Sequence, residues 1–585
     1  MFFQVSSPTV LLLLVSSSSF WGVTMGLGGR QAASTAARTL QQETAAELPP
    51  ATFEVVTDCW FDIPDGNSAD CGYLIVPANR RRWTEEGDTA TVKVAVARLL
   101  HPSSGGENSH PDPLVYLGGG PGEAIISVLS IPGAYEGFAG LGVASNRDVI
   151  LIDQRGAGFS EPALNCPVGA AYADVFALPS SSENAGELFS AAMSLCGQKL
   201  SENSNIHLED FITSENAADI ESLRIALGYE EWNLWGVSYG SRLALEIMRK
   251  YPNGIRTSIL DSVMKPTLEL GDNIETAHRS FSLLFDSCAA DPECNAAFPD
   301  LKEVFETVIN DLDANPPTIQ PIHPETGKPT DILLTGAFFE TIFFRFLYDA
   351  GAIPYLPGAI YAAANDGDYS LIEGGIPALF NLDKIFSVGM FLSMRCNGDN
   401  VALPSIEEYD AIKASNAEYD YLSGLVNLYL PFRPLAVVCP EWDAGTADPI
   451  TWQPVVNDDI PTMLMTGEFD PALNPEAGEE VASTLANSYL YEFPGMGHGN
   501  VGSHPCPTQM LFQFLDNPTQ EPDSSCMSEM GVHFEVAQPA ATDGQSKDDE
   551  DTATNGSGSS GGSVLVASTT TTIKYLIGMV FLVFI

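Results

Sequence analysis

Residues 232–241 have the sequence Trp-Asn-Leu-Trp-Gly-Val-Ser-Tyr-Gly-Ser, in which a short apolar run ends in Gly-x-Ser-x-Gly. A segment with helical character, Arg242 to Lys250, follows at once. This arrangement predicts a serine on a strained turn between a strand and a helix, with its hydroxyl exposed to a substrate. Gly236 and Gly240 suit such a turn because a Cβ would clash where the two backbones crowd together. Ser238 is therefore our candidate nucleophile, and an incidental serine between two turn glycines is the alternative.

Length and charge narrow the range of functions. The chain has 585 residues, enough for a large core with an inserted domain. It carries 76 acidic and 26 basic residues, for a formal net charge of −50. Such a chain repels a polyanion, so we expect no nucleic acid partner. The charge is explained by a solvated acidic surface, or by a cleft that attracts cationic groups such as peptide amines.

The ten cysteines fall as near neighbours along the chain. Together with a secretory leader, an even number of cysteines suggests up to five local disulfides. Spacing alone does not fix their connectivity. The neighbour scheme pairs Cys59 with Cys71, Cys166 with Cys196, Cys288 with Cys294, Cys396 with Cys439, and Cys506 with Cys526. No Cys-x-x-Cys pair occurs, so we expect no zinc site, no other metal and no cofactor.

Both ends of the chain resemble targeting segments. Residues 1–26 contain an apolar run and small residues, as in a signal peptide, and residues 27–50 form a polar leader. An acidic and Gly/Ser-rich linker, 521–562, precedes a hydrophobic tail, 563–585, whose final apolar run is too short to cross a bilayer as a helix. These features predict a cell-surface or extracellular protein with a GPI-attachment signal. A tail anchor and plain secretion are the alternatives.

A glycine run follows an apparent buried strand well before Ser238. The strand, Pro113 to Leu117, leads into Gly118-Gly119-Gly120-Pro121-Gly122. Backbone N–H groups can converge there without obstruction by side chains, as an oxyanion hole requires. We predict that Gly119 or Gly120 supplies one donor. Tyr239, the residue after the nucleophile, supplies the other.

Two charged stretches have structural interpretations. The strand Asp148 to Asp153 leads into a glycine loop that contains Arg155, and we expect Asp153 and Arg155 to form an ion pair that fixes this loop. The run Arg80-Arg81-Arg82 is interpreted as a solvated turn, with a processing site as the alternative.

The order of the elements predicts an α/β fold with a mostly parallel sheet. Residues 51–263 alternate strands and helices, including an amphipathic helix from Asn216 to Leu227 before the serine turn. The alternation fades over 264–400, where helical patterns such as Gly336 to Tyr348 indicate an inserted cap. We assign 401–520 to the C-terminal part of the core, in which the sheet resumes at Ile460.

Two late loops provide the remaining candidate catalytic residues. Asp470 follows the strand that begins at Ile460, at the position expected for a catalytic acid, and Glu468 is its rival. His498 follows the apparent strand Ser488 to Phe493 and is flanked by glycines, which predicts a mobile, open loop. The order Ser, Asp, His along the chain favours His498 over the alternative His504.

These stretches resemble the prolyl aminopeptidase and tripeptidyl aminopeptidase group of the α/β-hydrolase superfamily. The matching motifs are Cys71-Gly-Tyr-Leu-Ile-Val-Pro77, Gly119-Gly-Pro-Gly122, Asp153-Gln-Arg-Gly-Ala-Gly-Phe-Ser160, Gly236-Val-Ser-Tyr-Gly240, Gly467-x-x-Asp470 and Gly497-His-Gly499. Cys396-Asn-Gly-Asp and Cys439-Pro-Glu-Trp442 resemble the tripeptidyl-aminopeptidase-like C-terminal domain, which implies that these two cysteines pair. Gly118 stands where prolyl aminopeptidases usually have His, which favours the tripeptidyl branch.

The resemblance implies a serine exopeptidase that acts on peptides with a free N-terminus through a Ser238–Asp470–His498 triad. It also implies that acidic residues of the cap bind the substrate amine, for which Glu340 and Asp349 are the candidates. An esterase or lipase with the same triad is one alternative. A non-catalytic surface adhesion protein is another, although such proteins tend to lose the nucleophile.

Overall fold

The computed structural model describes residues 48–536 except 104–109, 167–181, 204, 268–269, 325, 378–381 and, within 399–431, all but 405, 407, 408, 411 and 422. The described residues belong to one compact unit. The expected signal peptide, most of the leader, the Gly/Ser-rich part of the linker and the hydrophobic tail lie outside them. None of the helices in the described ranges is long and apolar enough to cross a membrane.

A nine-stranded sheet forms the centre of the molecule, with strand order β1-β2-β3-β5-β4-β6-β7-β10-β11. The strands β1, β2 and β3 pair antiparallel, and β3 also pairs antiparallel with β5. From β5 to β11 all neighbours are parallel. The strands are β1 (Thr52–Val55), β2 (Ala69–Pro77), β3 (Thr91–Leu99), β4 (Leu114–Leu117), β5 (Val149–Asp153), β6 (Trp232–Ser238), β7 (Ile255–Val263), β10 (Thr462–Gly467) and β11 (Ser488–Phe493). The predicted mostly parallel α/β fold is confirmed.

Both faces of the parallel strands are covered by helices, which explains why β4, β5, β6 and β10 are buried along their whole length. Side chains alternate between the faces: Val115 and Leu117 of β4 join one apolar cluster, and Leu114 and Tyr116 join the other. The first cluster includes α7 (Thr213–Leu227) and α8 (Tyr239–Lys250), and the second includes α4 (Ala134–Ser145) and α21 (Pro505–Asp516). Burial on both sides fixes the sheet as the rigid platform of the site.

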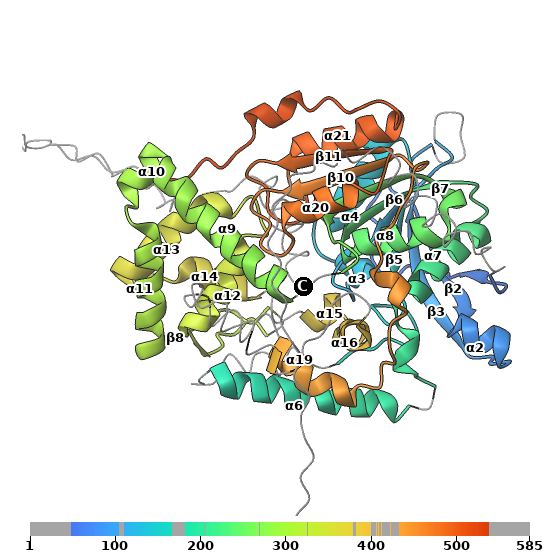
Figure 1. Ribbon diagram of the computed structural model, residues 1–585, viewed down its shortest axis with the longest axis horizontal. Helices are drawn as coiled ribbons and strands as arrows, with labels where there is room; N and C mark the ends of the chain where they lie inside the picture. Colours follow the sequence, from blue (N-terminus) through green and yellow to red (C-terminus); the bar gives the residue numbers. More distant parts are fainter. Residues whose placement is uncertain are drawn as a thin grey trace, which may run out of the picture. The chain divides into compact units, whose positions relative to one another are not determined.

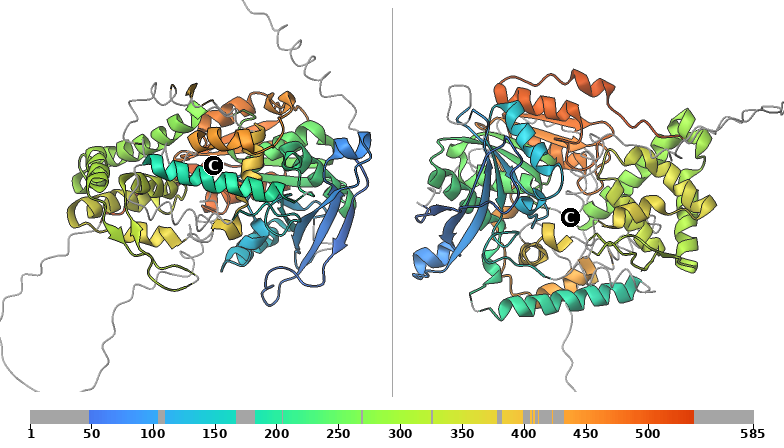
Figure 2. Two further views of the ribbon diagram at one scale, coloured as in Figure 1. Left: turned by 90° about the horizontal axis from the view of Figure 1, so that it is seen from below. Right: turned by 180° about the vertical axis from the view of Figure 1, so that it is seen from behind.

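Most of the helices that follow β7 and precede β10 in the chain lie beside the sheet (Figure 1). In Figure 2 the same helices lie to one side of the strands when the molecule is seen from behind, and α6 (Ser182–Ser201) runs below them. We refer to the described part of 270–397 as the cap. It contains α9 (Leu270–Ala290), α10 (Pro292–Ala297), α11 (Leu301–Ala314), α12 (Gly336–Phe346), α13 (Leu356–Asp366), α14 (Ser370–Gly375), α15 (Leu382–Ile385), α16 (Val388–Asn397) and the strand pair β8 (Thr318–Ile319) and β9 (Ile332–Leu333).

Four more α-helices, all short, complete the described part of the chain. They are α2 (Arg80–Glu85), α3 (Ile125–Val128), α19 (Phe432–Val438) and α20 (Pro475–Ala482). The helix α19 packs against α6, which is itself an excursion from the first part of the core. The sheet resumes at Thr462, so the described parts of 401–461 contribute no strand to it.

Five disulfides join the near neighbours of the sequence. They are Cys59–Cys71, Cys166–Cys196, Cys288–Cys294, Cys396–Cys439 and Cys506–Cys526. The Cys396–Cys439 bond joins α16 to the segment that follows α19. All ten cysteines are therefore bonded and none is a free thiol.

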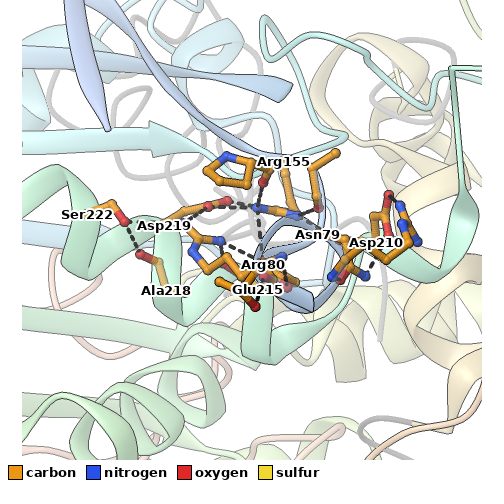
Figure 3. Close-up of polar contacts among 12 residues, drawn as sticks. Asn79, Arg80, Arg155, Asp210, Glu215, Ala218, Asp219 and Ser222 are labelled. Atoms are coloured by element: carbon orange, nitrogen blue, oxygen red, sulfur yellow. Dashed lines mark hydrogen bonds and ion pairs between the residues drawn. The ribbon is translucent and has the colours of Figure 1, made fainter. Parts of the chain in front are cut away.

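A buried ion network corrects two predictions from the sequence (Figure 3). Arg155 does not pair with Asp153. Its guanidinium donates to both carboxylate oxygens of Asp219 on α7 at 2.7 Å, and to the carbonyls of Ala78 and Asp210. The Asp153 carboxylate instead accepts the N–H groups of Ile126 and Phe159.

The arginine run lies in this network rather than in a solvated turn. Arg80 begins helix α2 and donates to Glu215 at 2.6 Å and to Asp219 at 2.8 Å. Arg82 donates to Glu209 and Asp210, each at 2.6 Å. Only Arg81 is exposed, with 62 % of its side chain accessible. The sequence could not reveal this because the acidic partners lie more than 120 residues further along the chain.

Candidate active site

Ser238 lies at the junction of β6 and α8 in a conformation that only a tightly held turn imposes. Its backbone has φ 58° and ψ −124°, a strained combination for a residue with a side chain. The two glycines of the motif make the turn possible. A Cβ on Gly240 would lie 1.9 Å from the Leu117 carbonyl oxygen, and a Cβ on Gly236 would lie 2.1 Å from the Gly240 oxygen. The strand, the helix and the neighbouring strand β4 can therefore converge at the serine.

The Ser238 side chain is only 2 % exposed. Its Oγ has no hydrogen-bond partner among the residues that the structure describes. Ser238 is the N-cap residue of α8, so the positive end of the helix dipole lies beside it. The strained backbone at a helix N-terminus is typical of a nucleophile. The expectation that the hydroxyl is exposed is wrong for this structure, because the Ser238 Oγ is buried.

Asp470 and His498 form the second part of the site. The Asp470 Oδ2 lies 2.8 Å from the His498 Nδ1. The other oxygen, Oδ1, accepts the main-chain N–H groups of Ala472 and Leu473 at 2.9 and 3.0 Å. Both side chains are buried. Asp470 is thus fixed by its own turn, and it in turn fixes the imidazole through one ring nitrogen.

The alternatives to this pair have other partners. Glu468 accepts the N–H of Gly495 at 2.7 Å and so fixes the turn before the histidine rather than the histidine itself. His504 is the N-cap residue of α21, where its Nδ1 accepts the N–H of Cys506 at 3.2 Å. Neither has the position that the triad requires.

The histidine loop is buried and held by hydrogen bonds, so the prediction of a mobile, open loop is wrong. The N–H of His498 donates to the Tyr348 carbonyl at 2.9 Å, and the N–H of Gly499 donates to the Ser262 Oγ at 2.9 Å. A Cβ on Gly497 would lie 2.3 Å from the Tyr348 oxygen. The glycines thus allow close backbone contact and do not confer freedom of movement.

Strand β7 and the turn after helix α12 of the cap provide the residues that position His498. Asp261 accepts the N–H groups of Asn500 and Val501 and the Asn500 side-chain amide, at 2.8 to 3.0 Å. Complete burial raises the pKa of Asp261, and these donors oppose the shift. On the other side the Tyr348 ring lies 4.9 Å from the imidazole centroid. Neither residue stands out in the sequence, since β7 has the pattern of an ordinary core strand.

The glycine loop after β4 lies against the nucleophile. A Cβ on Gly119 would be 3.3 Å from the Ser238 Cβ. The Gly119 N–H, however, donates to the Glu123 Oε2 at 2.7 Å, so of the two predicted glycines it is the one already engaged by a carboxylate. Gly120 has φ 103°, which favours glycine, and Tyr239 begins α8.

Glu123 is a residue of the site that the sequence interpretation missed. Its buried carboxylate also accepts the Tyr116 hydroxyl at 3.1 Å. Burial raises the pKa of Glu123 to about 7, against the opposing effects of the Gly119 N–H and the Tyr116 hydroxyl. Burial likewise raises the pKa of Asp153 to about 7. A glutamate directly after Gly-Gly-Pro-Gly was the available signal.

The cap closes directly over this loop. Ala124 donates its N–H to the Ile385 carbonyl at 2.8 Å, and Ser387 donates its N–H to the Gly122 carbonyl at 2.8 Å. The ring of Phe386 approaches so closely that a Cβ on Gly120 would lie 2.7 Å from its Cε2. The segment before α16 is therefore a wall of the site and not a distant lid.

The two acidic cap residues occupy different positions. Asp349 comes directly after Tyr348, the residue that contacts His498, and burial raises the pKa of Asp349 to about 6. Its Oδ1 accepts the N–H of Gly351 at 2.8 Å. Glu340 lies earlier, on α12, and is buried. Of the two, Asp349 is the one next in sequence to Tyr348, whose ring packs on His498.

Comparison with known proteins agrees with this geometry. A family model described as the alpha/beta hydrolase fold matches residues 112–505, which is more than half of the chain. The chain belongs to the α/β-hydrolase fold family. The matched range includes Ser238, Asp470 and His498.

Several curated relatives are peptidases by name. The chain is 28 % identical to serine protease Hip1 of Mycobacterium tuberculosis, over 46 % of this chain and 49 % of that protein. It is 30 % identical to a probable proline iminopeptidase of Streptomyces coelicolor, over 35 % and 51 %. It is 28 % identical to a tripeptidyl aminopeptidase of Streptomyces lividans, over 36 % and 38 %. The matches thus span about half, or less, of each relative, and they confirm the resemblance noted from the motifs.

Proposed function

We propose that this protein is a serine peptidase that hydrolyses peptides from a free N-terminus. The observation that carries the proposal is the Asp470–His498 hydrogen bond, in a fold that places the strained Ser238 at the end of β6, a parallel strand of the same sheet. The names of the relatives support a peptide substrate rather than a simple ester. Retention of the nucleophile and of the buried acid–histidine pair argues against a purely adhesive role.

In the proposed mechanism His498 acts as general base and then as general acid. Its Nδ1 faces Asp470, so the other ring nitrogen, Nε2, accepts the proton of Ser238 as the oxygen attacks the scissile carbonyl. Asp470 holds the tautomer and stabilises the imidazolium. The proton then passes to the leaving amine, and a water molecule hydrolyses the acyl-enzyme by the same steps.

The oxyanion is stabilised by the main-chain N–H groups of Gly120 and Tyr239. Gly119 is replaced by Gly120 in this role because its own N–H donates to Glu123. Loss of one such donor typically reduces the rate by about 10²- to 10³-fold. Glu123 therefore acts as a positioning residue that holds the glycine loop against Ser238.

The free α-amine of the peptide requires a nearby carboxylate. Asp349 is the better of the two candidates because it follows Tyr348, which packs on His498. Glu340 remains the second candidate and lies on α12, the helix that precedes Tyr348 and Asp349 in the chain.

A panel of peptides tests the proposal. Unblocked peptides of four to six residues and their N-acetylated forms are incubated with the enzyme, and the products are identified by mass spectrometry. We expect release of short N-terminal fragments from the unblocked peptides alone. Faster turnover of p-nitrophenyl esters than of any aminoacyl or tripeptidyl naphthylamide, by a large margin, would instead indicate an esterase.

We also propose that the protein passes through the secretory pathway and is held at the cell surface by a GPI anchor. Five disulfides support the first part, since they persist in oxidising compartments. The second part rests on the composition of residues 543–585, which lie outside the described residues. Release from intact cells by a phosphatidylinositol-specific phospholipase C tests it. Retention after that treatment argues for a tail anchor.

A further inference from the structure

Helix α16 of the cap holds a buried cation. Arg395, in the last turn of α16, is only 1 % exposed. Its Nε and Nη1 atoms have no hydrogen-bond partner among the residues that the structure describes. The contact that it does make is with an aromatic face: its Cζ lies 5.1 Å from the centroid of the Phe391 ring. Burying such a charge without a carboxylate partner costs free energy, and an anionic ligand would offset that cost.

The surroundings of Arg395 connect it with the catalytic residues. Besides burial, the ionisable neighbours that act on it are Arg242, which lowers its pKa, and Tyr348, which opposes that effect. Burial is the largest cause and brings the pKa of Arg395 to about 10, so the guanidinium is still protonated at neutral pH. Arg242 lies one turn beyond Ser238 on α8, and Tyr348 contacts His498.

The rest of α16 is rigidly fixed, so Arg395 cannot easily move out to solvent. Cys396 is bonded to Cys439, and the Trp442 indole donates to the Ser393 Oγ at 3.0 Å. The Asn397 side chain donates to the Ala444 carbonyl. At the other end of the helix, Ser387 pairs with the glycine loop beside Ser238. A fixed, dehydrated guanidinium is preorganised to bind an anion strongly.

We propose that Arg395 binds a carboxylate of the peptide substrate and makes this enzyme selective for acidic peptides. The inference rests on the proposed peptidase function and assigns a specificity to the same site. The carboxylate comes either from an Asp or Glu side chain or from the C-terminus of a short peptide. A planar guanidinium suits both, because it can donate to the two oxygens of one carboxylate through Nη2 together with either Nε or Nη1.

A set of four unblocked peptides distinguishes the two sources. One position carries Glu or its neutral isostere Gln, and the C-terminus is a free acid or an amide. For the wild type we expect kcat/KM to be about 10- to 100-fold higher for the peptide with the recognised carboxylate, the range for a charged hydrogen bond. Ratios close to one for both comparisons would overturn the proposal without any variant.

Variants then assign the preference to one side chain. In Arg395→Gln the ratio of acidic to neutral turnover falls towards one, and Arg395→Lys, which keeps the charge but not the fork, gives an intermediate ratio. Labelling of Ser238 by an uncharged fluorophosphonate shows that each variant is folded. The exposed Arg81→Gln is the matched control and leaves the ratio unchanged. Equal loss for acidic and neutral peptides in both Arg395 variants would contradict a role in selectivity.

Binding measurements separate this inference from the proposed function. Calorimetry with Ser238→Ala compares the affinities of the acidic and neutral peptides without any turnover. If no peptide is cleaved by the wild type but acidic peptides bind Ser238→Ala more tightly, the peptidase proposal fails and the carboxylate site stands. If the wild type cleaves peptides but acidic peptides bind Ser238→Ala no more tightly than neutral ones, the peptidase proposal stands and the carboxylate site fails.

Discussion

The Glu123 carboxylate accepts the main-chain N–H of Gly119 at 2.7 Å, within the loop that lies against the nucleophile. A carboxylate buried in this way has a pKa raised to about 7. Below pH 4.5 this group is protonated in both the folded and the unfolded chain. Between about pH 4.5 and 7 only the unfolded chain releases the proton, so the free energy of unfolding falls as the pH rises.

Glu123→Gln should remove this dependence, since the amide mimics the protonated acid. We expect the variant to gain on the order of 3 kcal/mol relative to wild type between pH 4.5 and pH 8, from the size of the pKa shift. Urea unfolding of both proteins at several pH values measures the difference in their free energies of unfolding. Asp153 contributes with the same sign in both proteins, but less in the variant, because the Glu123 charge is one of the causes that raise the Asp153 pKa. A stability difference that does not change with pH would show that Glu123 is ionised throughout.

Asp470→Asn and Glu468→Gln form a matched pair, because the two acids lie two residues apart and only Asp470 contacts His498. Asp470→Asn should lower kcat by about 10⁴-fold, as the imidazole adopts the wrong tautomer. Glu468→Gln retains an acceptor for the Gly495 N–H and should lower kcat less than tenfold. Steady-state kinetics on an unblocked peptide decides between them. The opposite ranking would make Glu468 the catalytic acid.

Gly497→Ala should disturb the site through backbone contact alone. Its Cβ would lie 2.3 Å from the Tyr348 oxygen, and this carbonyl also accepts the His498 N–H. We expect kcat to fall at least 100-fold. Gly374→Ala is the control, since its Cβ would meet nothing within 4 Å and alanine favours the helix. Full activity in Gly497→Ala would mean that the histidine loop moves freely, as its glycines first suggested.

Asp219→Asn should destabilise the core without entering the site. The substitution leaves the buried Arg155 guanidinium without its main carboxylate, and loss of one partner of a buried pair costs about 3–5 kcal/mol. Denaturant unfolding measures this loss. The exposed control Glu85→Gln should change stability by less than about 0.5 kcal/mol. Equal effects would show that the network in Figure 3 contributes little.

The sequence was informative where the signal is local. The glycines around Ser238, the buried strands and the order of the candidate catalytic residues all depend on short stretches, and the strands β6, β7, β10 and β11 lie where these patterns placed them. The sequence was uninformative where partners are distant. The pairing of Arg155 with Asp219 and the anchoring of His498 by Asp261 join residues far apart in the chain.

Two further differences have a shared physical cause. Glycines next to His498 suggested mobility, but in the fold they allow backbones to touch. The Gly119 N–H was one of two candidate oxyanion donors, with that of Gly120, yet a glutamate four residues later accepts it. In both cases a glycine can either leave the backbone free or allow another segment to approach it closely. Which of these occurs depends on the segment that packs against the glycine in the fold.

The most direct test of the central claim is covalent labelling of the nucleophile. Wild-type protein is treated with a fluorophosphonate, and the adduct is mapped by peptide mass spectrometry. We predict a single phosphonylated residue, Ser238, no adduct in Ser238→Ala, and much slower labelling in His498→Ala. An unmodified wild type, or an adduct that persists in Ser238→Ala, would contradict the assignment of this site as a serine hydrolase centre.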